Sequence, residues 1–337
     1  MSAAVDPTLT LTVVVPVFNE AENLAALHQR LADALQPTNL SWDVLYVDDG
    51  STDQSLAVIR QLAADEPTVG WLSLSRNFGK ELAMTAGLDH TSADAVVIID
   101  ADLQDPPELI PALIDRWREG YDVVYAQRTA RAGESLVKRG TAAGFYRVIN
   151  WLSRTRVPPD TGDFRLLSRR AVEALGRLRE RHRFMKGLFA WVGYRQIAVP
   201  YEREPRLGGS TKFSYRSLWN FALEGITSFS NVPLKAASYL GLGASLGAMV
   251  YGFYIIAKTL LYGDPVPGYP SLMVVILFLG GVQLLALGII GEYLGRVFVE
   301  AKQRPLYLVG ESQPASRQVG RSENPREASL KAVPAGD

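Results

Sequence analysis

The chain has 337 residues, with 35 Lys and Arg against 35 Asp and Glu, three His and no Cys. The absence of cysteine excludes a disulfide scaffold, a cysteine-ligated metal site and a thiol nucleophile. The net charge of zero argues against a nucleic acid partner. This total hides an asymmetry, because residues 1–110 carry a net charge of −13, residues 111–235 one of +12 and residues 236–337 one of +1. The asymmetry indicates either two solvated faces of opposite sign or separate sites for charged partners.

After an N-terminal tail at residues 1–10, short apolar runs alternate with stretches of helical pattern. The runs predict strands at residues 11–17, 42–47, 69–74, 95–99 and 123–126. Helices are predicted between them, at residues 20–35, 54–64, 81–88 and 107–117. Continuous apolar runs are typical of strands buried on both faces, and their alternation with helices predicts a mostly parallel sheet. We therefore expect an α/β domain over residues 11–214.

Two stretches without charged residues follow, at residues 236–257 and 271–291. At about 1.5 Å per residue, each is long enough to cross a hydrocarbon core of about 30 Å. We therefore predict two transmembrane helices within residues 233–295, joined as a hairpin. Lys and Arg flank the outer ends of the hairpin, whereas only Lys258 lies near its connector. The positive-inside rule then places the α/β domain and the C-terminus in the cytoplasm, in a multi-pass protein of the inner membrane.

The segments beside the hairpin have patterns of their own. Residues 215–232 carry apolar side chains at helical spacing, which predicts an amphipathic helix lying on the membrane surface or packed against the α/β domain. Residues 296–310 are expected to form a cytoplasmic juxtamembrane segment. Residues 311–337, rich in Ser, Pro, Arg and Glu, are expected to be disordered. Alternate positions from 177 to 183 are arginine, and we expect these side chains to be solvated or to face the membrane.

Two acidic clusters stand at the ends of predicted strands. Asp48 and Asp49 follow the second strand and open a Gly-Ser turn, and Asp100, Asp102 and Gln104 follow the fourth strand. The carboxyl ends of parallel strands are where α/β folds bind ligands. Carboxylate and amide oxygens are the ligands that Mg²⁺ and Mn²⁺ prefer beside substrate phosphates. One such cluster is more often a capped turn, but two of them predict a metal-assisted phosphate site.

Six motifs stand out along the chain. They are PVFNE at 16–20, DDGSTD at 48–53, SRNFGK at 75–80, DADLQDPPE at 100–108, TGDFRL at 161–166 and RLGGSTK at 206–212. These motifs resemble those of the family 2 glycosyltransferases of the GT-A fold. With the hairpin added, the chain resembles the polyisoprenyl-phosphate glycosyltransferases, a group that includes dolichyl-phosphate mannose synthase and bactoprenol glucosyltransferase. The resemblance implies a GT-A nucleotide-diphospho-sugar transferase domain with a mostly parallel sheet, followed by a two-helix transmembrane hairpin.

The resemblance also implies a role for each matching residue. The residues that it assigns to the nucleotide sugar are Pro16, Phe18, Glu20, Asp48, Asp49, Lys80, Asp100, Arg206, Ser210 and Lys212. Those that it assigns to Mg²⁺ or Mn²⁺ are Asp100, Asp102 and Gln104, and those that it assigns to the lipid phosphate are Arg128 and Arg139. It gives catalytic roles to Asp102, which would hold the metal, and to Asp163. Because a phosphate monoester has a second pKa of about 6 and is already nucleophilic at neutral pH, we expect Asp163 to orient the acceptor at least as much as to act as a base.

The implied activity is transfer of a sugar from a UDP-sugar to undecaprenyl phosphate or another polyprenyl phosphate, with inversion at the anomeric carbon. Glucose is the first expectation, while GlcNAc, galactose, a uronic acid, mannose and aminoarabinose-type sugars stay open. The product would be a lipid-phosphate sugar that serves cell-envelope glycan modification. Members of the group assemble as homo-oligomers, often tetramers, at the lipid bilayer.

Two other functions stay open at this point. The first is a processive polysaccharide synthase, which usually has more membrane spans and a Gln-x-x-Arg-Trp motif. In this chain Leu113 stands where that motif has Gln before Arg116 and Trp117. The second is a non-catalytic membrane scaffold that binds nucleotide sugars, which would not need both acidic clusters together with Asp163.

Overall fold

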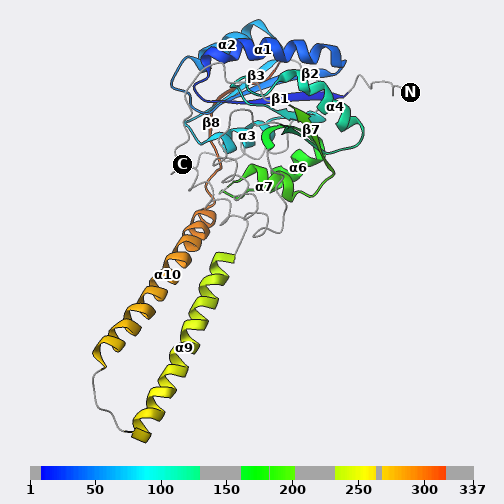
Figure 1. Cartoon of the computed structure of the whole chain (residues 1–337). Coiled ribbons are helices and arrows are strands. Elements are labelled where there is room, and N and C mark those ends of the chain that lie inside the picture. The colour runs from blue at the N-terminus through cyan, green and yellow to red at the C-terminus, as the bar shows by residue number, and fades with distance from the viewer. Residues whose placement is uncertain (1–8, 130–160, 182, 202–231, 263–267, 316–337) are drawn as a thin grey trace, which may run out of the picture.

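A computed structural model describes residues 9–129, 161–181, 183–201, 232–262 and 268–315. In this part of the chain one sheet lies between two layers of helices, and a pair of long helices projects from one side of it (Figure 1). The predicted fold class, a mostly parallel α/β sheet with a C-terminal helical pair, is confirmed.

The element bounds follow the predicted pattern closely. The strands are β1 Thr10–Val17, β2 Ser41–Asp48, β3 Val69–Leu74, β4 Ala95–Ile98, β5 Val123–Arg128, β6 Thr161–Ser168, β7 Gln196–Tyr201 and β8 Val309–Gln313. The α-helices are α1 Ala21–Leu35, α2 Ser55–Asp65, α3 Lys80–Asp89, α4 Ile110–Arg118, α6 Arg169–Arg177, α7 Met185–Trp191, α9 Val232–Tyr262 and α10 Tyr269–Ala301. Short 3₁₀ turns cover Gln36–Thr38 and Pro107–Leu109. All five strands and four helices predicted for the first part of the chain are present.

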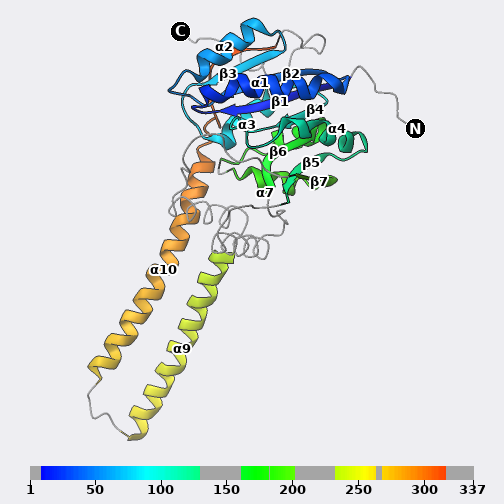
Figure 2. The same ribbon diagram turned by 45° about the horizontal axis from the view of Figure 1, so that its top comes forward.

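The sheet has the strand order β7-β5-β6-β4-β1-β2-β3-β8, which can be followed in Figure 2. Strands β4, β1, β2 and β3 run parallel to one another, and β7 runs parallel to β5. Strand β6 runs antiparallel to both β4 and β5, and β8 runs antiparallel to β3. Because β6 is reversed, its first residues lie beside the carboxyl end of β4, where the acidic cluster begins.

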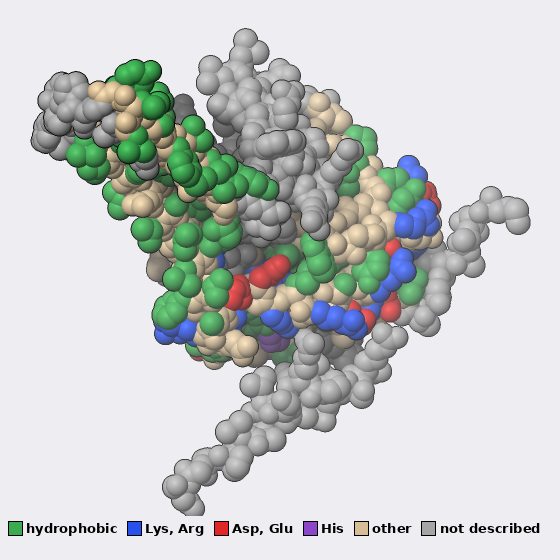
Figure 3. All heavy atoms as spheres, turned by 90° about the horizontal axis from the view of Figure 1, so that it is seen from below, with side chains coloured by type: hydrophobic (Ala, Val, Ile, Leu, Met, Phe, Trp, Pro, Cys, Tyr) green, Lys and Arg blue, Asp and Glu red, His purple; other side chains and the backbone are tan. Residues whose placement is uncertain are grey.

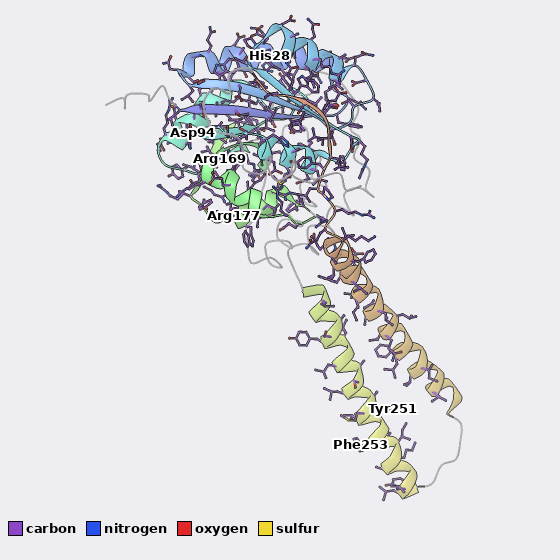
Figure 4. All side chains as sticks on the ribbon, turned by 180° about the vertical axis from the view of Figure 1, so that it is seen from behind. His28, Asp94, Arg169, Arg177, Tyr251 and Phe253 are labelled. Carbon is purple, nitrogen blue, oxygen red and sulfur yellow. The ribbon has the colours of Figure 1, made fainter. Side chains whose placement is uncertain are left out.

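Both faces of the sheet are buried, which explains the uninterrupted apolar runs. In β1 the side chains of Val13 and Val15 pack with α1, α2 and α4, whereas Val14 between them packs with α3, α6 and α7 on the other face. The hairpin projects from the side covered by α3, α6 and α7 (Figure 1). His28 lies in α1 on the far side, where its ring contacts the Tyr46 hydroxyl at 3.1 Å (Figure 4).

The two long helices contain the predicted spans. Within them, Ala237–Tyr262 and Phe278–Ala301 are long and apolar enough to cross a membrane. Large apolar side chains such as Tyr251 and Phe253 are exposed along α9 (Figure 4). Residues 215–231, predicted as a surface helix, lie outside the described part of the chain.

The structure extends one prediction at the C-terminal side of the hairpin and corrects another. Helix α10 continues past residue 291 to Ala301, because Arg296 pairs with Glu292 one turn earlier at 3.2 Å and keeps the polar end helical. The tail, expected to be disordered from residue 311, begins with β8 on the edge of β3. Gly70 makes this possible, since a Cβ there would lie 2.7 Å from the backbone nitrogen of Ala315. The α/β domain therefore extends beyond 11–214 and includes residues after the hairpin.

Of the alternate arginines, Arg177 is exposed, as predicted, whereas Arg179 and Arg181 bind acidic partners in the protein. Arg179 donates two hydrogen bonds to Asp89, at 2.6 and 3.0 Å, and the Tyr307 hydroxyl donates to the same carboxylate at 2.9 Å. Arg181 donates its backbone N–H to Glu300 at 2.6 Å. The five residues in these contacts form what we call the latch, which ties the α/β domain to the end of α10 and to the segment after it.

Candidate active site

The strand directions bring the predicted site residues to one edge of the sheet. Strands β1, β2 and β4 end there, while β6 begins there. In the registers, Ile98 faces Arg165 across β4 and β6, and Gln127 faces Thr161 across β5 and β6. The residues just beyond these pairs, Asp100, Asp163 and Arg128, therefore lie close together although they are distant in sequence.

The loop after β2 is a buried polar support. Asp48 accepts hydrogen bonds from the Ser51 N–H at 3.1 Å and the Ser73 hydroxyl at 3.0 Å. The Asp49 carboxylate accepts the backbone N–H groups of Phe78 and Gly79, at 2.7 and 2.9 Å. Burial raises the pKa of Asp49, and these two N–H groups oppose the rise. Both carboxylates thus shape the loops around the site, and a direct contact from either to a nucleotide stays a prediction.

Gly50 completes this turn. Its φ of +67° favours glycine, and a Cβ would lie 2.5 Å from the backbone carbon of Arg76. The loop after β2 and the loop before α3 can therefore touch only because residue 50 has no side chain.

The loop after β1 is fastened to the loop after β2. The Asn19 side-chain oxygen accepts from the backbone N–H of Thr52 at 2.8 Å, and the Glu20 N–H donates to Ser55 at 2.9 Å. Pro16 lies within β1, and Phe18 is left 40% exposed at the loop. An exposed aromatic ring on a fixed loop is available to a flat ligand, as predicted for a nucleotide base.

Lys80 lies between two carboxylates at the centre of the site. Its Nζ atom is 2.6 Å from Asp100 Oδ1 and 2.5 Å from Asp163 Oδ2. Lys80 is the first residue of α3, and Asp49 fixes the backbone just before it. The Oδ1 atom of Asp163 is buried and has no hydrogen-bond donor within the described residues. The prediction gave Lys80 to the donor, and the structure shows it also as the counter-ion of two predicted site carboxylates.

The charges around Asp163 decide its protonation. Burial favours its neutral form, but Lys80 and Lys186 outweigh burial and lower the pKa of Asp163 below its usual range. Burial raises the pKa of Asp100, opposed by Lys80. Asp163 is thus an ionised group and a weak base, which favours the orienting role over proton abstraction.

The proposed metal ligands lie on the turn after β4. Asp102 Oδ1 accepts the backbone N–H of Gln104 at 3.2 Å, across Leu103, whose φ is +58°. No group of three or more His, Cys, Asp or Glu side chains in the described part of the chain is arranged to hold a metal ion. The set of two carboxylates and one amide still has the oxygen chemistry of a hard cation, and Asp100 already binds the Lys80 ammonium in this structure. The metal site stays a prediction.

Arg128 reaches the site from the end of β5. Its guanidinium lies close to Gly162, the residue directly before Asp163. A Cβ added to Gly162 would lie 3.2 Å from the Arg128 Nη2 atom. Its Nε donates to the Tyr201 hydroxyl at 3.3 Å, and that hydroxyl donates to Asp105. The other predicted phosphate-binding residues, Arg139, Arg206, Ser210 and Lys212, lie outside the described residues.

Three charged residues around Asp163 escaped the sequence analysis. Glu81 accepts the Met185 N–H at 2.6 Å, and burial raises the pKa of Glu81 to about 7. Arg165 is 4% exposed, donates to the Gly162 carbonyl at 2.7 Å and lies 3.7 Å from the centre of the Phe189 ring. Burial lowers the pKa of Arg165 to about 10. Lys186 is the third residue. Of these three residues, only Arg165 lies in one of the six motifs, TGDFRL. Helix α7, which carries Lys186, has no sequence pattern that points to the site.

The face of the molecule from which the hairpin projects carries side chains of both charges. Figure 3 views this face and shows carboxylate side chains gathered beside the base of the hairpin, with Lys and Arg side chains around them. Helix α3, whose first residue is Lys80, covers the same face of the sheet from which the hairpin projects (Figure 1).

The class of protein follows from this architecture. A mostly parallel sheet with acidic side chains at its carboxyl edge, followed by two apolar helices, is a GT-A-like α/β fold with a C-terminal hairpin. Two family models match the chain in the same two parts. The glycosyl transferase family 2 model matches residues 12–176, and the GtrB C-terminal hairpin model matches residues 232–297. The chain belongs to glycosyl transferase family 2.

Curated relatives extend over most of the chain. The SfII prophage-derived bactoprenol glucosyl transferase of Shigella flexneri is 46% identical to this chain. The matched region covers 90% of this chain and 98% of that protein. The uncharacterized glycosyltransferase sll0501 of Synechocystis is 54% identical, covering 90% and 96%. Among solved structures, the mannosyltransferase PcManGT from Pyrobaculum calidifontis in complex with GDP-Man and Mn²⁺ is 19% identical, with a TM-score of 0.44 over 90% of both chains.

Proposed function

We propose that the protein transfers glucose from UDP-glucose to a polyprenyl phosphate at a membrane surface, with inversion at the anomeric carbon. The observation that carries this proposal is the contact of Lys80 with both Asp100 and Asp163, at the edge of the sheet where the predicted site residues meet. Relatives named bactoprenol glucosyl transferase, 46% identical over nearly the whole chain, support the choice of sugar and acceptor.

The reaction is a displacement at C1 of the sugar. An oxygen of the acceptor phosphate attacks C1, the bond between C1 and the donor diphosphate breaks, and UDP leaves with the electron pair. The acceptor oxygen needs no strong base, because a phosphate monoester is largely a dianion at neutral pH. Asp163 therefore acts mainly through the cations that it holds in place, and Lys80 is the one in direct contact. Attack from the side opposite the leaving group yields a β-linked product from an α-linked donor.

Asp100, Asp102 and Gln104 would hold Mg²⁺ or Mn²⁺. A bound ion offsets the charge that develops on the leaving diphosphate. Lys80 shares Asp100 with this site and so supplies a second positive charge next to the same phosphates. Arg206, Ser210 and Lys212 would close over the donor diphosphate, and Arg128 with Arg139 would contact the lipid phosphate.

The two apolar helices support a membrane location for this reaction. We place the hairpin across the inner membrane, with the α/β domain and the C-terminus in the cytoplasm and residues 215–231 along the membrane surface. The catalytic edge then faces the plane in which the acceptor phosphate lies. Assembly as a homo-oligomer is part of the same proposal.

The experiment that tests the function uses the full chain in lipid nanodiscs that contain polyprenyl phosphate. Labelled UDP-glucose, UDP-GlcNAc, UDP-galactose and GDP-mannose are added separately, each with and without EDTA. We expect organic-extractable label from UDP-glucose, lost on chelation and restored by Mg²⁺ or Mn²⁺. Absence of lipid-linked label from every donor would contradict the transferase assignment, whereas label that survives EDTA would contradict only the metal.

A further inference from the structure

The charged neighbours of Asp163 include Lys186, for which the described part of the chain offers no hydrogen-bond or ion-pair partner. Lys80 pairs with two carboxylates and Arg165 donates to backbone carbonyls, whereas Lys186 forms no hydrogen bond or ion pair within the described residues. Burial lowers the pKa of Lys186, and the charge of Asp163 opposes this. An ammonium group that is partly withdrawn from water yet unpaired is suited to an anionic ligand.

The turn that carries Lys186 is held against the site at two points. The backbone N–H of Met185 donates to Glu81 at 2.6 Å, and Glu81 adjoins Lys80 in α3. One turn further along α7, the Phe189 ring lies 3.7 Å from the Arg165 guanidinium, two residues after Asp163. Lys186 lies between these two contacts, on a short helix whose Met185, Leu188 and Phe189 are buried. Its position relative to Asp163 is therefore fixed by packing.

Helix α7, which carries Lys186, lies on the face of the sheet that α3 and α6 also cover. In the strand order, β6 separates β5 from β4, and the loops after β1 and β2 lie beyond β4. Helix α7 packs with buried residues of β5 and β6 on the hairpin side of the sheet (Figure 1). Five residues before Lys186, the N–H of Arg181 binds Glu300 at the end of α10. The segment that leads into α7 is thus joined to the end of the hairpin, the part of the chain that we place at the membrane with the acceptor.

We infer that Lys186 binds the phosphate of the polyprenyl acceptor, an assignment that rests on the proposed function. Its ammonium contacts the phosphomonoester from the α7 side, while Arg128 approaches from the end of β5. A lysine ammonium is a compact point charge with three donors, which suits a phosphate that must turn one oxygen toward C1. Asp163 accepts a hydrogen bond from Lys80, and its charge also favours the charged form of Lys186.

The test compares Lys186→Met and Lys186→Arg with the unmodified full chain in nanodiscs. Donor and acceptor concentrations are varied separately. Loss of one charge-assisted contact predicts that K186M raises the KM for polyprenyl phosphate about 10- to 100-fold, while the KM for UDP-glucose changes less than about twofold. K186R should recover most of the loss. Arg177→Met is the matched control, because it removes an exposed positive charge from the same domain and should leave both constants unchanged.

Binding without turnover gives a second readout. A short-chain isoprenyl monophosphate in detergent solution should bind K186M about 10-fold or more weakly than the unmodified chain by calorimetry, whereas UDP should bind both equally. Unchanged acceptor binding, or a loss that appears in UDP binding instead, would overturn the assignment of Lys186 and leave the transferase function intact. If the unmodified chain bound no isoprenyl phosphate and formed no lipid-linked sugar, the proposed function itself would fail.

Discussion

At the scale of single residues, the environment of Asp163 separates two roles that sequence motifs cannot distinguish. The motif TGDFRL places an acid at the start of β6, and the register of β6 against β4 brings it to Asp100. The Lys80 contact at 2.5 Å, together with Lys186, lowers the pKa of Asp163 and makes its carboxylate a weak base. We therefore regard Asp163 as an anchor for cations around the acceptor.

This role predicts how Asp163→Asn behaves with pH. The variant should lower kcat about 10- to 1000-fold, because the cations lose the charge that orders them. Asp163 stays ionised throughout pH 6–9, so the ratio of the two rates should be nearly the same at pH 6.5 and pH 8.5. Steady-state rates with saturating UDP-glucose give the measurement. A ratio that rises about tenfold for each pH unit would indicate that Asp163 titrates in this range.

Asp43 gives a separate, stability-based prediction away from the site. It faces Thr12 across β1 and β2, and burial raises its pKa to about 6, with the Thr12 hydrogen bond opposing. An unfolded Asp has a pKa of about 3.9, so the fold prefers the protonated form and loses stability as the pH rises from about 4 through 6. Asp43→Asn removes this loss. In thermal unfolding it should be more stable than the unmodified chain at pH 7.5, on the order of 1–2 kcal/mol after solvent screening.

The pH dependence is the discriminating part of that comparison. At pH 4.5 most of the advantage of D43N should be gone, because the aspartate is then largely protonated in the folded protein. Equal differences at pH 4.5 and pH 7.5 would show that the substitution acts through packing rather than charge.

At the scale of elements, the sequence predicts those strands and helices whose formation depends on the local pattern of apolar residues. The runs that became β1 to β5 are apolar and continuous, and the helices between them have apolar spacing that can be seen in sequence. Strand β8 could not be predicted, because its residues are polar and its order comes from pairing with β3 and from the space left by Gly70. The reversed direction of β6 is also a property of the sheet, although it is what brings Asp163 to Asp100.

The candidate site also contains residues that motifs predict and residues whose role depends on packing. Asp48, Asp100 and Asp163 could be predicted because each follows or begins a strand within a recognisable motif. Glu81, Arg165 and Lys186 gain their meaning only from packing, since α7 is placed beside β6 by buried contacts and by the bond between Glu81 and the Met185 N–H. The burial of the Asp49 carboxylate under the 78–79 backbone also needs the fold to be known.

The latch is an element whose function can be tested directly. Glu300 at the end of α10 accepts the Arg181 N–H, and it joins the hairpin to the segment that leads into α7. Glu300→Ala should lower transfer to polyprenyl phosphate in nanodiscs several-fold, because the catalytic edge loses its fixed position over the bilayer. Transfer to a short-chain isoprenyl phosphate in solution should change little.

Glu292→Ala is the control for that experiment, since Glu292 pairs only with Arg296 one turn away in the same helix among the described contacts. Equal losses with the membrane-bound and the soluble acceptor in E300A would contradict a positioning role and indicate general damage to the site.

At the scale of the whole molecule, the charge asymmetry gains a physical meaning in this account. The acidic first part supplies the strand-end carboxylates for which we propose a metal and the donor, and the basic middle part supplies Arg128, Arg165 and Lys186. Part of the positive charge serves the latch, where Arg179 and Arg181 bind acidic partners. A neutral total is thus compatible with two phosphate-bearing substrates, because the opposite charges occupy different parts of one site.

The central claim is sugar transfer from a nucleotide to a lipid monophosphate, and mass spectrometry with NMR of the purified lipid product tests it most directly. The full chain in nanodiscs, supplied with UDP-glucose and polyprenyl phosphate, should form polyprenyl-phosphate glucose with one phosphorus atom and a β-anomeric linkage, and should release UDP. A product with two phosphorus atoms, an α-linkage, or unconsumed UDP-glucose after long incubation would contradict the account.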